Sequence, residues 1–154
     1  MDSKTEALDA QVTLIQSLQL GSDIAGAILA HLRTALPQEG CGLLAVRLGG
    51  DGAAVATRFY PGTNLDASPT RYTMDPGEVL AAHRDIEANE WTLGAIVHSH
   101  PATPPTPSPT DLREAFYPEA LMVIVSFAAG LPTMRAWRLA ADRSAFIEEG
   151  ILES

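Results

Sequence analysis

Two histidines and one aspartate have the types and the spacing of a metal site. His98 and His100 stand one residue apart at the end of an apolar run, residues 93–97, whose length and composition predict a buried strand. Because alternate side chains on an extended backbone share a face, the two imidazoles can converge on one point. With Asp111 they make a three-ligand set that leaves a fourth position for water, the arrangement of a catalytic rather than a structural zinc site.

Two local features are expected to bring Asp111 back toward the histidines. Residues 101–107 include four prolines. Proline lacks an N–H and fixes φ, so this density excludes a helix or a central strand and predicts a stiff, ordered loop. Ser108 and Pro109 have the types favoured at the N-cap and the first position of a helix. Asp111 would then lie in the first helical turn and face the histidines.

Other interpretations of these side chains have to be weighed. A histidine pair alone is weak evidence, but the strand, the loop, the capped helix and the aspartate together favour metal binding. The single cysteine, Cys41, opens an apolar run, so we interpret it as a small buried residue near the site, with a Cys/His nucleophile as the alternative. We expect His31 to be solvated and His83 to lie on a helix surface or at the core edge, neither as a ligand.

The spacing of these residues resembles a known family motif. The pattern His98-x-His100, seven residues, then Ser108-x-x-Asp111 resembles the H-x-H-x7-S-x-x-D motif of the JAMM/MPN metalloproteases. Residues 37–44, P-Q-E-G-C-G-L-L, resemble the upstream P-x-E-x-C/A-G-L-L segment of that family. The resemblance is specific because several separated positions must agree at once.

The resemblance extends over most of the chain, from about residue 12 to about residue 140. The compact length, with no appended domain, is similar to the stand-alone prokaryotic members. A further passage resembles the family's N-x-x-x-x-P-x-x-Y/F-x-x-D-P run, at Asn64, Pro69, Tyr72, Asp75 and Pro76.

The resemblance implies a zinc metalloprotease with one Zn²⁺ per chain, held by His98, His100 and Asp111 together with a catalytic water. Glu39 would act as general base toward that water and then as acid toward the leaving amine. Without the rest of the motif, a glutamate just ahead of a buried strand would more simply be solvated. Ser108, at a helix start beside the site, could donate a hydrogen bond to the developing oxyanion. The expected reaction is amide hydrolysis.

The substrate is also an expectation from the resemblance. The resemblance implies that the protein cleaves peptide or isopeptide bonds that follow the C-terminal tail of a ubiquitin-like protein. Such proteins include small sulfur-carrier proteins of the ubiquitin fold. Such a tail would lie extended and add a strand beside the catalytic groove, as peptides do at exposed sheet edges. The other interaction that we consider is the formation of a homodimer.

The pattern of elements predicts a mixed α/β (α+β) fold with a central, mostly antiparallel sheet and helices on its faces. The expected strands are residues 11–20, 41–48, 53–60, 93–97, 121–127 and 133–139, followed by a poorly determined element at 145–152. The expected helices are residues 24–36 and 76–89, with a short helix after Ser108. The resemblance implies the MPN version: a curved mixed sheet with one helix on each side and the zinc at its edge, resembling the cytidine-deaminase-like arrangement.

The composition favours one domain over residues 12–154, preceded by a loose polar tail at residues 1–11. Apolar residues make up 46% of the chain, as in globular proteins. No membrane-length apolar run and no signal peptide are evident, so we expect a cytoplasmic protein. The net charge of −9, with 10 scattered Lys and Arg, argues against nucleic acid. One cysteine excludes an intrachain disulfide.

Three alternative functions stay open. A non-catalytic MPN scaffold or binding module normally lacks some ligands, whereas all are present here. A RadC-like protein of DNA metabolism has a similar H-x-H-P…P-S-x-x-D run, but the acidity and the lack of a helical DNA-binding extension count against it. A zinc deaminase would need H-x-E and P-C-x-x-C elements, which the sequence does not contain.

Overall fold

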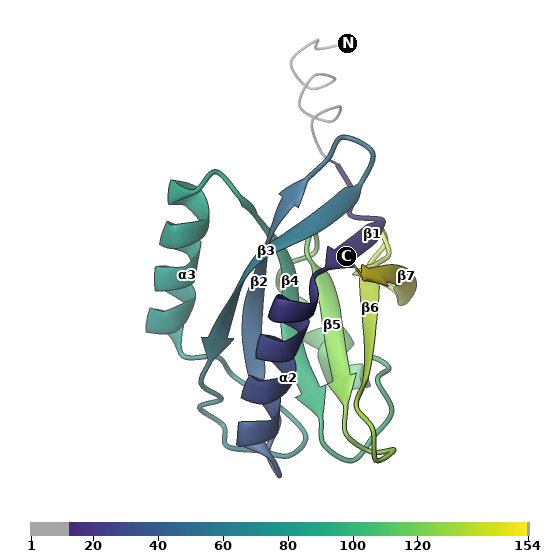
Figure 1. The fold of residues 1–154 in the computed structure, drawn as a ribbon. Coiled ribbons are helices and arrows are strands. Elements are labelled where there is room, and N and C mark those ends of the chain that lie inside the picture. The colour runs from purple at the N-terminus through teal and green to yellow at the C-terminus, as the bar shows by residue number, and fades with distance from the viewer. Residues whose placement is uncertain (1–12, 154) are drawn as a thin grey trace.

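The computed structural model describes residues 13–153 as a curved sheet with a helix on each face (Figure 1). The strands are β1 (Ser17–Leu20), β2 (Cys41–Leu48), β3 (Ala53–Gly62), β4 (Thr92–His100), β5 (Leu121–Ser126), β6 (Thr133–Leu139) and β7 (Phe146–Glu153). The helices are α2 (Ser22–Ala35), α3 (Pro76–Ala88) and α4 (Pro109–Arg113).

Most element boundaries follow the sequence pattern. The bounds of β2 and β6 are those predicted, and β3 runs two residues past its predicted end. Helix α3 begins at Pro76 as expected, because the Asp75 side chain accepts hydrogen bonds from the N–H groups of Gly77 (2.8 Å) and Glu78 (3.3 Å). Turn and cap chemistry therefore locates these elements correctly.

The beginning of the chain departs from the prediction. Strand β1 starts only at Ser17, because residues 13–16 form no strand, and residues 11 and 12 lie outside the described part. Helix α2 starts at Ser22, with Gly21 as an N-cap that makes no side-chain hydrogen bond. The predicted tail at residues 1–11 lies outside the described residues, and the single-domain assignment stays a prediction.

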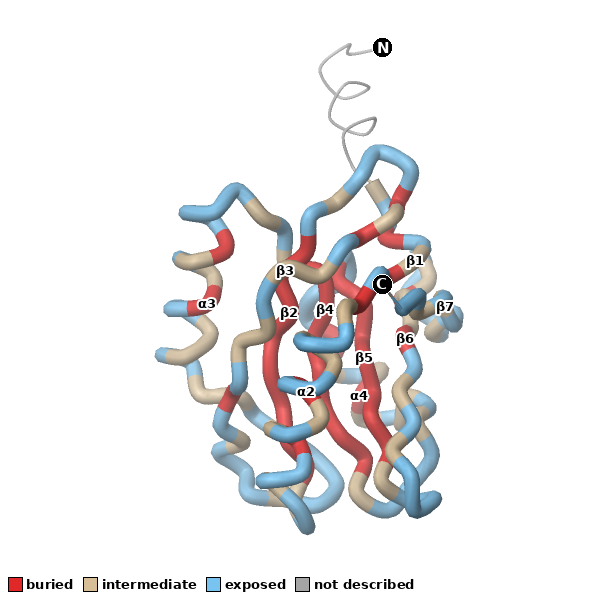
Figure 2. The backbone as a smooth tube through the Cα atoms, in the orientation of Figure 1, coloured by how far each residue is buried: buried red, intermediate tan, exposed pale blue. Residues whose placement is uncertain are grey.

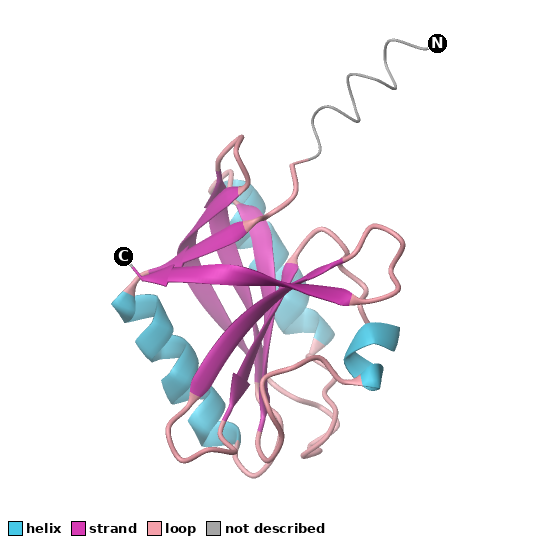
Figure 3. Cartoon of the chain, turned by 90° about the vertical axis from the view of Figure 1, so that its right-hand side faces the viewer, coloured by secondary structure: helices cyan, strands magenta, loops and turns pink. Residues whose placement is uncertain are grey.

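The sheet curves until it closes. The strand order is β1-β3-β2-β4-β5-β6-β7, and β1 pairs in parallel with both β3 and β7, so the two ends of the sheet are joined into a closed barrel. The β2–β3, β2–β4, β5–β6 and β6–β7 pairs are antiparallel, and β4 and β5 are parallel. Figure 3 shows this curvature from the side. The expected mixed sheet is present, and His98 and His100 lie at the C-terminal end of β4, which pairs with β2 on one side and β5 on the other.

The two faces of the central strands pack against different helices. In the antiparallel pairing of β2 and β4, Leu44 opposes Ala95 and both join the main core against α2. Leu43 opposes Ile96, and both pack in a second cluster with Ala82 of α3. Because side chains alternate along a strand, His98 and His100 of β4 lie on the same face as Ile96. Figure 2 shows that burial is concentrated on β2, β4 and β5.

Within residues 13–153, no helix combines the length and the apolar character that a membrane crossing requires.

Candidate metal centre and active site

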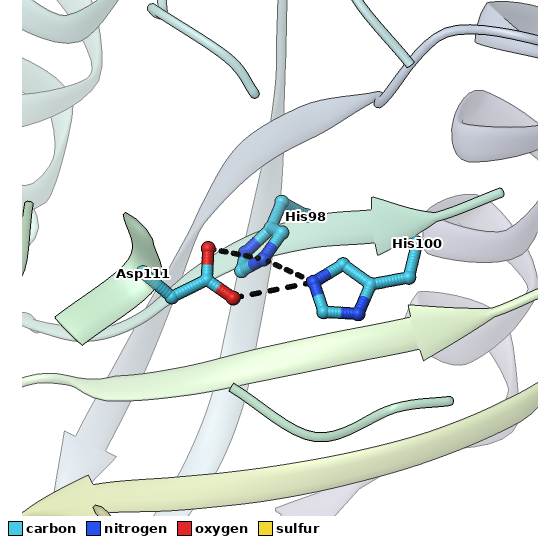
Figure 4. A group of neighbouring side chains, drawn as sticks. All are labelled: His98, His100 and Asp111. Atoms are coloured by element: carbon cyan, nitrogen blue, oxygen red, sulfur yellow. Dashed lines mark hydrogen bonds and ion pairs between the residues drawn. The ribbon is translucent and has the colours of Figure 1, made fainter. Parts of the chain in front are cut away.

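The structure brings His98, His100 and Asp111 together (Figure 4). The Nε2 atoms of the two histidines are 3.2 Å apart. His98 Nε2 is 3.2 Å from Asp111 Oδ1, and His100 Nε2 is 3.2 Å from Asp111 Oδ2. All three side chains are buried. One possible ligand atom from each of the three side chains lies within 4.8 Å of the other two, so β4 and α4 bring the side chains together as their spacing predicted.

The two elements hold these side chains by different means. His98 and His100 share a face of β4 because they are two residues apart on a strand. Asp111 is fixed by a capping box: its N–H donates to Ser108 Oγ (3.0 Å), and its Oδ2 accepts from the Ser108 N–H (2.8 Å). Pro109 occupies the first helical position. The short helix α4 thus orients the carboxylate of Asp111.

The donor geometry fits a zinc ion. Ligand atoms bound to one tetrahedral zinc at ~2.0–2.1 Å are about 3.3 Å from one another. Here the two histidine Nε2 atoms are 3.2 Å apart, and each lies 3.2 Å from a different oxygen of Asp111. His100 Nδ1 lies 2.8 Å from the Pro104 carbonyl, which can only accept, so Nδ1 carries the hydrogen. In the neutral ring, Nε2 of His100 then offers its lone pair to a metal.

The pKa directions of two of these groups favour metal binding. Burial lowers the pKa of His98, which favours the neutral imidazole. Burial would raise the pKa of Asp111, but hydrogen bonds with His100 and His98 hold it well below its usual range. Burial also opposes the protonation of His100, yet its hydrogen bonds with Asp111 and Pro104 raise its pKa. A proton on His100 would therefore compete with a bound metal.

Glu39 enters this site from β2. The β2–β4 register pairs Cys41 with His98 and continues one residue further, where Ser99 N–H donates to the Gly40 carbonyl (3.0 Å) and Gly40 N–H donates to Ser99 Oγ (2.8 Å). If this register is extended by one more residue, Glu39 falls opposite His100, on the same face of the sheet. The charges of His100 and Asp111 act on the Glu39 carboxyl, which agrees with that placement.

Burial determines the chemistry of Glu39. Its side chain is buried, and within residues 13–153 its Oε1 has no hydrogen-bond partner. Burial raises the pKa of Glu39 to about 7, while the charge of His100 lowers it and that of Asp111 raises it. Its backbone is held by Ser68, whose carbonyl accepts from Glu39 N–H (2.8 Å), and by Asn64, whose Nδ2 donates to the Glu39 carbonyl (2.9 Å). The simpler interpretation of Glu39 as a solvated residue was wrong.

Ser108 lies half-buried at the helix start beside Asp111. Its hydroxyl accepts the Asp111 N–H, as an N-cap does. Among the residues that the structure describes, this hydroxyl donates to no other group, so its hydrogen is available. The capping position and an additional donor role are therefore compatible.

The remaining candidates are placed outside the donor set. His31, expected to be solvated, is half-buried, and its Nε2 lies 3.0 Å from the carbonyls of both Cys41 and Gly62. Helix α2 packs on the sheet there, so a position off the apolar stripe still meets β2 and β3. His83 is half-buried and stacks on Tyr117 at 5.9 Å.

Cys41 is fully buried, and burial raises its pKa to about 12. A thiol that stays protonated is a poor nucleophile. The packing interpretation of Cys41 therefore agrees with its environment.

Two contacts of the histidines were not predicted. Tyr72 stacks on His98 with ring centroids 4.9 Å apart and an interplanar angle of 28°. Its position was matched to a family passage, but nothing in the sequence indicated its partner. The Pro104 carbonyl that orients His100 was likewise missed, because a proline-rich loop does not reveal which of its carbonyls turns inward.

A cavity of about 270 Å³ opens beside Asp111. Its apolar wall includes Leu43, Ile96 and Met122 of the sheet. Arg71 and Glu114 also line the cavity, and they form an ion pair of 3.1 Å. The donor set thus borders a space that can receive part of a substrate.

Comparison with known proteins identifies the class. Residues 21–140 match the family model for prokaryotic homologs of the JAB domain. The chain therefore belongs to this JAB/MPN family and is a JAMM-type hydrolase, as the motif predicted. This membership favours the peptidase interpretation over the RadC-like and deaminase ones.

Three individual relatives match more than half of the chain. The chain is 40% identical over 109 residues to the CysO-cysteine peptidase of Mycobacterium tuberculosis, covering 71% of this chain and 73% of the relative. It is 34% identical over 125 residues to the desampylase of Haloferax volcanii, covering 78% and 87%. It is 41% identical over 87 residues to a probable TtuB-protein conjugate cleaving protease of Thermus thermophilus, covering 56% and 55%.

A solved structure supports the fold. The solution structure of a protein from Desulfitobacterium hafniense superposes with a TM-score of 0.79 at 40% identity, covering 89% of this chain and 92% of that one. A protein from Salinibacter ruber gives a TM-score of 0.66 at 35% identity.

Proposed function

We propose that the protein is a zinc peptidase that hydrolyses the amide bond after the C-terminal tail of a ubiquitin-like or sulfur-carrier protein. His98, His100 and Asp111 hold the metal. One observation carries this proposal: His98 Nε2 and His100 Nε2 are 3.2 Å apart, each is 3.2 Å from an oxygen of Asp111, and the buried carboxyl of Glu39 feels the charges of His100 and Asp111. A scaffold function would leave this arrangement unexplained.

The environments of the side chains indicate the role of each one in the reaction. If His98, His100 and Asp111 held a zinc ion, it would supply Lewis acidity toward the scissile carbonyl and lower the pKa of water toward 7. Glu39, with its pKa raised to about 7 by burial, is suited to accept a proton from the attacking water and to return it to the leaving amine. Ser108 donates its free hydroxyl hydrogen to the developing oxyanion.

The relatives support the substrate class. Their names refer to a CysO-cysteine peptidase, a desampylase and a protease that cleaves TtuB-protein conjugates. β1 pairs with β3 only at residues 53–55, so the addition of the substrate tail as a strand stays a prediction. The cavity beside Asp111 is our candidate for the place where the rest of the substrate lies. Homodimer formation stays a prediction.

Cleavage of a defined conjugate tests the proposal. The substrate is a small ubiquitin-fold protein that ends in Gly-Gly and is joined by an amide bond to a reporter amino acid. The zinc-loaded protein should release the reporter, and one zinc per chain should be found by elemental mass spectrometry. Glu39→Gln should bind zinc without cleaving, and His83→Ala serves as a control outside the site. Equal cleavage by wild type and Glu39→Gln would remove Glu39 from the mechanism.

A further inference from the structure

Three consecutive carbonyls of the proline-rich loop, residues 101–107, are each held by a different strand. The Ser126 hydroxyl of β5 donates to the Thr103 carbonyl at 2.6 Å. His100 Nδ1–H of β4 donates to the Pro104 carbonyl at 2.8 Å. Trp137 Nε1–H of β6 donates to the Pro105 carbonyl at 3.0 Å. The three donors lie on neighbouring strands, so the loop is fastened to the end of the sheet.

The loop has little else to hold it in place. Pro104 and Pro105 have no N–H, so they cannot donate to a neighbouring backbone. Within the described part of the chain, residues 101–107 make no backbone–backbone hydrogen bond. The position of the Pro104 carbonyl therefore depends on the bonds that its two neighbours accept from Ser126 and Trp137.

We propose that Ser126 and Trp137 are positioning residues for the metal centre, which act through the Pro104 carbonyl on His100. Their bonds to Thr103 and Pro105 hold the carbonyl between them where it accepts the Nδ1–H of His100. In the neutral ring, that bond keeps the hydrogen on Nδ1, so that Nε2 has a lone pair for a metal. This inference rests on the proposed metal site.

The neighbours of Ser126 determine the group to which its hydroxyl donates. The side chain is 2% exposed, and the Ala128 N–H donates to its Oγ at 3.2 Å. With that donor on one side, the hydroxyl hydrogen is directed to Thr103. Ser126 also lies opposite His100 in the β4–β5 register. The serine thus acts on the loop rather than on a substrate.

Losing either bond would free the loop carbonyls. His100 could then carry its hydrogen on Nε2, which blocks the atom that has to bind the metal. Loss of such supporting hydrogen bonds typically lowers metal affinity ~10–100-fold. His98 offers a contrast, since within residues 13–153 its Nδ1 has no hydrogen-bond partner and its ring is held by the stack with Tyr72.

Two variants and two readouts test the inference. Ser126→Ala removes one bond, and Trp137→Phe removes the other while an aromatic ring stays in place. Zinc affinity is measured by competition with a chromophoric chelator. The tautomer of the His100 ring is read from its ¹⁵N chemical shifts in the metal-free protein at pH 8.5. Trp91→Phe, which replaces the other tryptophan, and Ser144→Ala, in an exposed turn, are the matched controls.

In wild type, Nδ1 of His100 should carry a hydrogen. We expect both variants to lose zinc affinity by ~10-fold or more and to show a larger fraction of His100 rings without a hydrogen on Nδ1, while the controls match wild type. Folded variants with wild-type affinity and an unchanged tautomer would overturn the inference. If Ser126→Ala does not fold, Trp137→Phe decides alone. The tautomer readout needs neither metal nor substrate, so a protein that cleaves no conjugate would contradict the proposed function and leave this inference standing.

Discussion

Asp111 and Glu39 are two buried carboxyl groups of one site whose environments shift their pKa values in opposite directions. Asp111 is 7% exposed and Glu39 is 4% exposed, so burial alone does not separate them. Hydrogen bonds with His100, His98 and Ser108 hold the pKa of Asp111 far below its usual range. Within residues 13–153, Oε1 of Glu39 has no such partner, and burial raises its pKa to about 7.

The difference assigns different roles to the two groups. A carboxylate that stays charged at neutral pH is suited to hold a cation, and one that titrates near pH 7 is suited to move a proton. Paired carboxyl groups with divergent pKa values are a common sign of acid–base chemistry. The experiments below test whether the two groups can be separated in this way, beginning with the largest expected effect.

Asp111→Asn should remove both metal and activity. The amide keeps the shape but loses the charge that balances the cation, and it also weakens the acceptor of the Ser108 N–H. We expect zinc affinity to fall by more than the ~10–100-fold typical of supporting residues. Zinc content after dialysis, measured with conjugate cleavage, checks this result. Retention of zinc at wild-type affinity would show that Asp111 is not a ligand.

Glu39→Gln should separate catalysis from metal binding. The loss of a general base and acid typically costs ~10²–10⁴-fold in rate, so kcat/KM for a conjugate should fall by that factor. Zinc affinity should stay near that of wild type, which is the opposite of the result expected for Asp111→Asn. If Glu39→Gln instead lost its zinc, the two carboxyl groups would share one role.

Ser108→Ala should have a smaller effect, divided between rate and stability. Loss of an oxyanion donor typically costs on the order of 10²-fold in kcat. Loss of the N-cap costs ~1 kcal/mol of unfolding free energy. Ser108→Gly is the comparison, because glycine caps nearly as well as serine but has no hydroxyl. A rate loss in Ser108→Ala with wild-type kcat in Ser108→Gly would assign the whole effect to capping.

The metal-free protein should lose stability as the pH rises through the range of Glu39. The pKa of Glu39 is raised from 4.5 to about 7, so the folded protein keeps a proton that the unfolded chain releases. The contribution of this group to the unfolding free energy therefore falls between about pH 4.5 and pH 7 and stays low above that. Glu39→Gln should remove this dependence and stabilise the metal-free protein at pH 8 by about 3 kcal/mol.

Denaturant unfolding of the metal-free proteins at pH 4.5, 6 and 8 measures this effect. Wild type and Glu39→Gln should be similar at the lowest pH and diverge at the highest. Parallel curves for the two proteins at all three values would show that the Glu39 carboxyl is ionised when folded, contrary to the contrast with Asp111.

The parts of the site that were predicted correctly depend on short stretches of chain. The alternation of a strand places His98 and His100 on one face, and the capping box joins residues only three positions apart. Both follow from backbone geometry and from hydrogen bonds between near neighbours. The bounds of β2 and β6 were predicted for the same reason, since turn residues flank each strand.

The parts that were missed depend on contacts between distant residues. The closure of the sheet rests on the pairing of four-residue β1 with both β3 and β7. His31 is taken out of solvent by carbonyls of β2 and β3. The inward carbonyl of Pro104 is placed by side chains from three strands. No local pattern carries this information.

The sequence by itself determined the residue types of the candidate site, their convergence from a strand and a capped helix, and the family to which the chain belongs. Only the tertiary structure decided the charge states. Folding buries Glu39 near His100 and Asp111 and, within residues 13–153, gives its Oε1 no partner, whereas Asp111 accepts the Ser108 N–H and lies 3.2 Å from Nε2 of both histidines. The pKa of a carboxyl group depends on the desolvation and on the neighbours that folding supplies, and a linear chain specifies neither until its strands are in register.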